Sequence, residues 1–177
     1  TGGTIIPQHH PVNVAQRLAY LDHLSHGRIN VGFGQGGIKT DWTMFDLPAP
    51  REQGLMTLEA IEMVLKLWGA EAPVDFKGDY WHIRIDEIDE NLALGHILKP
   101  FQQPHPPVAM SIVKEESMAA KTAGMRGFLP ISVNMTPPHK VKRQWEVYCE
   151  GAAEAAHPEP DRGTWRVSRS IYVGESN

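Results

Sequence analysis

Hydrophobic residues follow two alternating patterns along this chain. Several stretches repeat apolar residues three or four positions apart, as at Val14, Leu18 and Leu21, which is the spacing of one helix face. Short continuous apolar runs of the kind that form buried strands lie between them. We therefore predict helices over 11–25, 52–68, 117–124 and 138–156 and strands over 4–7, 28–33, 108–112, 128–133 and 166–173. Strands that alternate with helices indicate βαβ units and a parallel sheet, either doubly wound or closed into a barrel.

Two segments interrupt this alternation. Residues 38–51 are predicted to form a polar loop, and residues 69–107 an irregular insertion with a hairpin that turns at Lys77-Gly78. There is no internal repeat, so we treat 1–177 as a single domain with both segments at one mouth of the fold. The chain has no initial Met and both its ends lie beside apolar runs, so we expect it to be part of a longer protein.

Composition narrows the classes of function. The 177 residues carry a formal net charge of −4, which argues against a nucleic-acid binder because such proteins have a basic face. No apolar run approaches the roughly 18 residues of a membrane helix, and no signal peptide is visible. The single cysteine, Cys149, cannot form an internal disulfide, so we expect a cytoplasmic protein. The nine histidines lack a metal-ligand spacing, so we predict no metal site.

A glycine-rich stretch follows the strand predicted over 28–33. Gly32, Gly34 and Gly37 match the G-x-G-x-x-G pattern of dinucleotide-binding folds. That pattern needs a helix that starts at its third glycine, and no apolar helical stripe begins before Glu52, so we reject a pyrophosphate site. Two interpretations stay open. The glycines let a flat ligand lie against the backbone at the carboxyl end of a barrel strand, or they form a flexible exit from the strand.

Several longer motifs resemble one family. The first reads His10-Pro11-Val12-x-x-Ala15-x-x-Leu18-Ala19-x-Leu21-Asp22-x-Leu24-Ser25-x-Gly27-Arg28, and the second Phe76-x-Gly78-x-Tyr80-Trp81. Together with the glycine-rich stretch, they make the whole chain similar to the bacterial luciferase-like flavin monooxygenases. Two later motifs resemble the limonene and diketocamphane monooxygenase branch: Ala123-Gly124-x-Arg126-Gly127-Phe128 and Trp145-x-x-Tyr148-x-Glu150-Gly151-Ala152.

This resemblance implies an α/β fold of the (β/α)8 TIM-barrel type, of which the chain would form a partial barrel, about strands three to seven. It also implies reduced FMN as the cofactor, with FAD possible, delivered by a separate flavin reductase and bound over the carboxyl ends of the strands. With O2, the enzyme would oxygenate a small apolar substrate, either terpene-like or a cyclic ketone, and it would act as a homodimer. The catalytic histidine of the family would precede residue 1, so we name no catalytic residue.

Candidate flavin contacts follow from the resemblance. One group lies at predicted strand ends and would face the flavin: Pro7, Gln8, Gly34, Gln35, Gly36 and Ser111. Ser117, at a helix start, would bind the flavin phosphate with Lys114 nearby, because helix N-termini attract phosphate. The alternatives are a plain N-cap serine and a solvated surface lysine.

Candidate substrate contacts lie in the polar loop and after the later strands: Trp42, Met44, Ser132 and Asn134. Residues 38–51 would then be a lid over the substrate, because long loops of barrels are usually functional. Alternatively, the aromatic residues hold the loop down, and the polar residues satisfy backbone groups. Met110, Ile112 and Met135 could add an apolar wall, although core packing is the default for such residues.

Two other functions stay open. A deazaflavin (F420)-dependent oxidoreductase on the same barrel would transfer hydride without oxygen, and a fold-level resemblance does not exclude it. A non-catalytic flavin-binding barrel is the other alternative. The chain has no nucleophile motif such as G-x-S-x-G, so in a monooxygenase the flavin would carry the chemistry.

Overall fold

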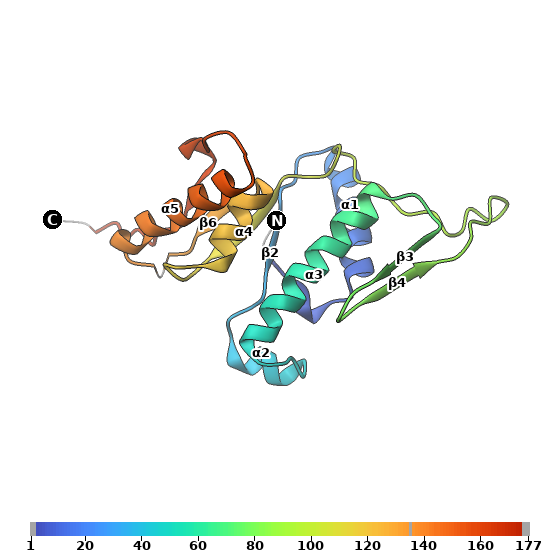
Figure 1. The fold of residues 1–177 in the computed structure, drawn as a ribbon, viewed down its shortest axis with the longest axis horizontal. Coiled ribbons are helices and arrows are strands. Elements are labelled where there is room, and N and C mark those ends of the chain that lie inside the picture. Colours follow the sequence, from blue (N-terminus) through green and yellow to red (C-terminus); the bar gives the residue numbers. More distant parts are fainter. Residues whose placement is uncertain (1–2, 135, 175–177) are drawn as a thin grey trace. The chain divides into compact units, whose positions relative to one another are not determined.

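The computed structural model describes residues 3–134 and 136–174 (Figure 1). The chain divides into two compact units, Thr1–Pro107 and Val108–Asn177. Each unit contains parallel strands joined by helices, which confirms the predicted α/β class. That the two units make one domain over 1–177 stays a prediction. None of the helices in the described ranges combines the length and the apolar character that a bilayer-spanning helix needs.

In the first unit, α1 (Pro11–Ser25) connects two short parallel strands, β1 (Thr4–Ile5) and β2 (Val31–Gly34). The helix begins where the sequence predicts because proline suits the first turn. In addition, His10 Nδ1 accepts a hydrogen bond from the Val12 amide at 3.3 Å. The local sequence is therefore enough to start this helix.

The apolar face of α1 packs on the second long helix, α3 (Pro50–Gly69). Val14, Ala15 and Leu18 are buried on α1. Trp68 of α3 donates a hydrogen bond from its indole nitrogen to the Ala15 carbonyl at 3.1 Å. Both predicted helices are confirmed, although Leu21 of the predicted α1 stripe is 37% exposed, and α3 begins two residues before the predicted start at 52.

The predicted hairpin is present within the 69–107 segment. β3 (Val74–Lys77) and β4 (His82–Ile85) pair antiparallel, and the turn between them is held by Glu59 of α3. The Glu59 carboxylate accepts hydrogen bonds from three successive turn amides, those of residues 79, 80 and 81, at 2.8 to 3.0 Å. A Cβ on Gly78 would overlap this carboxylate, so a larger residue there would displace the Glu59 side chain.

A helix that the sequence did not predict lies inside the 38–51 segment. α2 (Lys39–Met44) starts two residues after Gly37 and has no buried residue. The prediction of a loop throughout was wrong because a helix that buries nothing shows no apolar stripe. The rejection of a dinucleotide fingerprint now rests on packing. Such a fingerprint needs a helix packed closely on its strand, and six residues without a buried side chain do not provide one.

In the second unit, β5 (Val108–Ile112) pairs parallel with β6 (Leu129–Ser132), and β6 pairs parallel with β7 (Arg166–Val167). The two predicted helices come in the predicted order, α4 (Met118–Arg126) and α5 (Pro138–Glu154). A 3₁₀ turn that the sequence did not predict, η2 (Arg162–Thr164), precedes β7. β5 has the predicted bounds. β7 is shorter than the predicted 166–173, because the apolar residues 171–173 are at least 85% exposed and form no strand.

α4 and α5 cross at very close range. A Cβ on Gly124 of α4 would overlap the Tyr148 carbonyl of α5, and a Cβ on Gly151 of α5 would overlap the Lys121 carbonyl of α4. Both obstacles are backbone atoms, which cannot rotate away as a side chain can. Glycine at both positions therefore sets how closely the two helices pack.

Candidate functional site

The two strands of the first unit end side by side. Ile5 of β1 pairs with Gly34 of β2, so the segments that leave the two strands start at the same edge. The segment after β1 is a 3₁₀ turn, η1 (Ile6–Gln8), in which Pro7 is buried and Gln8 is half-buried. Carboxyl ends of parallel strands are where α/β folds place their ligand sites. Of the predicted pair in η1, only Gln8 offers surface to a ligand.

The glycine turn after β2 has one open position and one crowded position. A Cβ on Gly34 would meet no atom within 4 Å, so the backbone there borders open space. At Gly36, φ is +80° and a Cβ would lie 2.9 Å from Ile5 Cγ2, so glycine is required. Gln35 is exposed, and its side-chain oxygen lies 3.2 Å from the Cβ position of Gly54 on α3. Gly36 thus packs closely against Ile5 of β1, while Gly34 leaves room for a flat group.

The strands of the second unit also end in register. Ile112 pairs with Ser132, and Ser132 pairs with Val167, so the loops after β5 and β6 leave the sheet at one edge. Ile112 is fully buried in a cluster with residues of α4 and α5. Met110 shares its strand face and is also buried, so core packing describes both better than a substrate wall. Ser111 is exposed on the opposite face, as a ligand contact requires.

The loop between β5 and α4, residues 113–117, carries the predicted phosphate contacts. Ser117 occupies the N-cap position of α4, and its side chain makes no capping hydrogen bond. Its hydroxyl therefore stays available, which the plain N-cap interpretation does not expect. Lys114 is exposed, and no ion pair among the described residues uses its ammonium group. An available hydroxyl, an ammonium group and a helix N-terminus within four residues suit an oxyanion.

The same loop also carries two carboxylates, and α5 pairs both of them. Lys140 Nζ lies 3.7 Å from Glu115, and Arg143 Nε lies 2.6 Å from Glu116. The hydrogen bond from Arg143 holds the pKa of Glu116 below its ordinary value. The pKa of Arg143 is raised by its hydrogen bonds to Glu116 of the loop, to Glu150 of α5 and, less strongly, to Glu146 of α5. The negative charge of the loop is thus balanced from the neighbouring helix.

The two predicted polar contacts after β6 have different surroundings. Ser132 is fully buried, and its hydroxyl oxygen accepts a hydrogen bond from Trp165 Nε1 at 2.9 Å. This structural partner argues against the predicted substrate contact of Ser132. Asn134 is exposed and donates to Ser170 Oγ at 3.2 Å, so its substrate contact stays a prediction. Met135 lies outside the described residues.

The predicted lid residues lie on α2. Met44 is 73% exposed, whereas Trp42 is half-buried and its indole N–H has no partner within residues 3–134 and 136–174. The Leu47 amide donates to the Trp42 carbonyl at 2.8 Å and closes the turn after the helix. A short helix without buried residues has few contacts that hold it in place, as a lid requires. The lid role itself stays a prediction.

Two buried polar residues that the sequence analysis did not single out contact the β5–α4 loop. Gln144 of α5 is fully buried, and Thr136 in the turn before α5 is 5% exposed. A signal for Gln144 was present, because it lies between Val141 and Tyr148 on the buried face of α5, where a polar side chain is rare. No comparable signal marks Thr136, because its neighbours form no periodic pattern.

Comparison with known proteins assigns the chain to a family. The family model described as luciferase-like monooxygenase matches residues 1–177. The chain belongs to this family. This luciferase-like chain is 29% identical over 181 residues to 4-hydroxyprotoasukamycin monooxygenase of Streptomyces nodosus subsp. asukaensis, covering 99% of the chain and 46% of that protein. It is 30% identical over 178 residues to limonene 1,2-monooxygenase of Rhodococcus erythropolis, covering 99% of the chain and 42% of that protein.

Solved structures extend the likeness to the fold. The oxygenating constituent of 3,6-diketocamphane monooxygenase from Pseudomonas putida, a type II Baeyer-Villiger monooxygenase in complex with FMN, matches with a TM-score of 0.85 and 28% identity. The match covers 98% of the luciferase-like chain and 48% of that protein. An F420-dependent secondary alcohol dehydrogenase matches with a TM-score of 0.67 and 27% identity, over 90% of the chain and 44% of that protein. The luciferase-like barrel fold and its limonene and diketocamphane branch are thereby confirmed. The chain spans about half the length of the curated relatives it matches.

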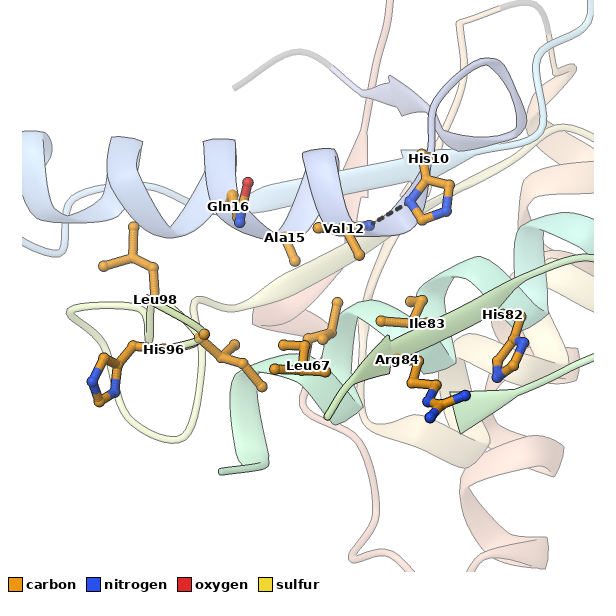
Figure 2. Close-up of a pocket in the computed structure, with 13 residues that line it drawn as sticks. His10, Val12, Ala15, Gln16, Leu67, His82, Ile83, Arg84, His96 and Leu98 are labelled. Carbon is orange, nitrogen blue, oxygen red and sulfur yellow. Dashed lines mark hydrogen bonds between the residues drawn. The ribbon is translucent and has the colours of Figure 1, made fainter. Parts of the chain in front are cut away.

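A cavity of about 390 Å³ lies elsewhere in the first unit of the luciferase-like chain, between α1, β4 and residues 95–98 (Figure 2). Its apolar lining includes Val12, Ala15, Leu67 and Ile83. Three of its lining side chains lie against carboxylates: His82 against Asp75, Arg84 against Asp86, and His96 against Glu90. None of the predicted flavin or substrate contacts lines this cavity, so it is separate from the predicted contacts.

No group of three or more metal-binding side chains occurs within the described part of the chain. Burial raises the pKa of the Cys149 thiol, with smaller effects from nearby charges. A thiol that stays protonated at neutral pH is a poor nucleophile.

Proposed function

We propose that this chain supplies flavin-binding elements of a luciferase-like monooxygenase that uses reduced FMN and O2. The observation that carries the proposal is the likeness to the FMN-bound oxygenating constituent of 3,6-diketocamphane monooxygenase, at a TM-score of 0.85 over 98% of the chain. FAD as the bound flavin stays an alternative within the same proposal.

The flavin ring is assigned to the glycine turn of the first unit. Gly34 borders open space, and a flat ring needs such a position, where no side chain separates it from the backbone. Gln35 and Gln8 lie at the same strand edge and offer amide groups to the polar rim of the ring. Ser111 of the second unit is assigned to the flavin because it is exposed on the strand face turned away from the helices.

The flavin phosphate is assigned to the β5–α4 loop. The first amides of α4 have no partner within their own helix, and they can donate to a phosphate oxygen. The Ser117 hydroxyl is not used in the helix cap, and the Lys114 ammonium supplies a positive charge in the same loop. These groups fit a phosphate monoester, which has three acceptor oxygens and a net negative charge.

When bound, reduced flavin supplies the electrons that activate O2 for oxygen transfer. In this proposal the role of the chain's own residues is to bind and orient the cofactor. The substrate is proposed to be small and apolar, either terpene-like or a cyclic ketone, since the relatives include limonene and diketocamphane monooxygenases. A separate flavin reductase and a homodimer complete the proposal.

The test is oxygen transfer by the intact protein. We would supply chemically reduced FMN and ¹⁸O2, present a panel of cyclic ketones and terpenes, and follow product mass. Incorporation of one ¹⁸O atom into a product, absent without protein or without flavin, is expected. Products that lack ¹⁸O would contradict oxygenation. If the protein neither forms a product nor binds FMN, the proposed monooxygenase function is wrong.

A second candidate is hydride transfer with F420. It is favoured by the likeness to an F420-dependent secondary alcohol dehydrogenase over 90% of the chain. An anaerobic assay distinguishes the two proposed functions, because hydride transfer between an alcohol and F420 needs no O2. Bleaching of the F420 absorbance by an alcohol without oxygen would favour this candidate over the monooxygenase.

A further inference from the structure

Side chains hold three successive backbone carbonyls at the start of the β5–α4 loop. Gln144 Nε2 donates to the Ile112 carbonyl at 3.4 Å and to the Lys114 carbonyl at 3.1 Å. Thr136 Oγ1 donates to the Val113 carbonyl between them, also at 3.1 Å. The backbone from the end of β5 to Lys114 is therefore fixed by two side chains, one on α5 and one just before it.

Gln144 is an unusual residue for its position. It is 0% exposed, and its Oε1 has no hydrogen-bond partner among the residues that the structure describes. The amide orientation follows from chemistry, because the two carbonyls only accept and so require the NH2 end. The oxygen is thereby left buried and unpaired, at a cost that an apolar side chain would avoid. The amide group of Gln144 therefore has a specific role, which is to hold the backbone of the loop through these two hydrogen bonds.

The same helix balances the charge of this loop. Lys140 and Arg143 pair with the two carboxylates that precede Ser117, at 3.7 Å and 2.6 Å. If these carboxylates were unpaired, two negative charges would lie beside the predicted phosphate site and repel the ligand. Geometry and charge of the loop are thus both set from the first two turns of α5.

We propose that Gln144 is a positioning residue for the flavin phosphate, with Arg143 supplying charge balance. Gln144 acts through the backbone of the loop, and it does not touch the flavin. By fixing the Ile112 and Lys114 carbonyls, it sets the direction from which Lys114 and Ser117 reach the phosphate. The inference rests on the proposed function, because it uses the phosphate contacts assigned there.

The experiment compares FMN with riboflavin, which has the same ring and no phosphate. Dissociation constants for both oxidised flavins are measured by fluorescence on the intact wild-type protein and on Gln144→Leu. We expect Gln144→Leu to weaken FMN by about fivefold or more, because it removes two hydrogen bonds to the loop, and to change riboflavin by less than about twofold. Lys142→Gln is the control, because its side chain is 76% exposed and pairs with Glu146 of the same helix. Neither constant should change there.

Each outcome decides the inference. Equal losses for FMN and riboflavin, or no loss for either, would overturn it, because the effect would not act through the phosphate. If Gln144→Leu does not fold, Arg143→Gln replaces it. We expect Arg143→Gln to weaken FMN more than riboflavin, most clearly at low salt, and an equal effect on both flavins would overturn the inference. A wild-type protein that binds FMN no better than riboflavin would instead overturn the proposed phosphate site itself.

Discussion

Replacing Ser117 with alanine separates the two roles that its position allows. An N-cap serine that is replaced by alanine usually costs a helix about 0.5–2 kcal/mol, because its oxygen caps a backbone amide. Ser117 makes no such hydrogen bond, so we expect the free energy of unfolding of the protein without flavin to fall by less than about 0.5 kcal/mol. A hydrogen bond to a charged phosphate contributes about 1.5–3 kcal/mol. Because Ser117 is half-exposed, we take the lower value, which corresponds to about tenfold weaker FMN binding.

The assay for Ser117→Ala combines urea unfolding of the protein without flavin with fluorescence titration of FMN. His10→Ala is the matched control, because the His10 ring does cap its helix. That variant should lose unfolding free energy and keep its FMN affinity. A Ser117→Ala protein that loses stability like the control and still binds FMN as the wild type does would refute the phosphate role and establish the plain cap.

Three other predictions test the second unit. Gly124→Ala should lower the free energy of unfolding by about 1–3 kcal/mol, because its Cβ would overlap a carbonyl of α5. Gly69→Ala is the control and should leave this free energy unchanged, because its Cβ would meet no atom within 4 Å. Equal shifts of the two urea midpoints would contradict the prediction. Ser132→Ala should cost about 1–3 kcal/mol in thermal unfolding, because it leaves the Trp165 N–H without its acceptor, and an unchanged melt would reopen a substrate role. The raised pKa of Cys149 predicts that alkylation rises only at a pH above the range of an ordinary thiol. The folded protein holds the thiol proton of Cys149 more tightly than the unfolded chain does. The stability that this thiol contributes is therefore present below its unfolded pKa and is lost as pH rises through its folded pKa. An alkylation profile like that of a free cysteine would contradict the burial of the thiol.

Elements with a strong local pattern were predictable from the sequence. The bounds of β5 follow from a continuous apolar run, since four of its five residues are buried. The helices α1 and α3 follow from apolar residues at helical spacing, because each buries one face. The glycine turn after β2 and the loop before α4 were predictable as candidate sites for the same reason, since they follow buried strands. The flavin itself was predicted only from the resemblance of the sequence motifs to a known family.

Other features depend on contacts between distant parts of the chain. α2 buries nothing and so leaves no pattern, and residues 171–173 have the apolar character of a strand without forming one. Ser132 looks like a site residue until Trp165, 33 positions away, donates to it. Gln144 meets the carbonyls of Ile112 and Lys114 across 32 and 30 residues. Periodicity reports which face of an element is buried, but the partner of each polar group on that face is chosen only when the chain packs.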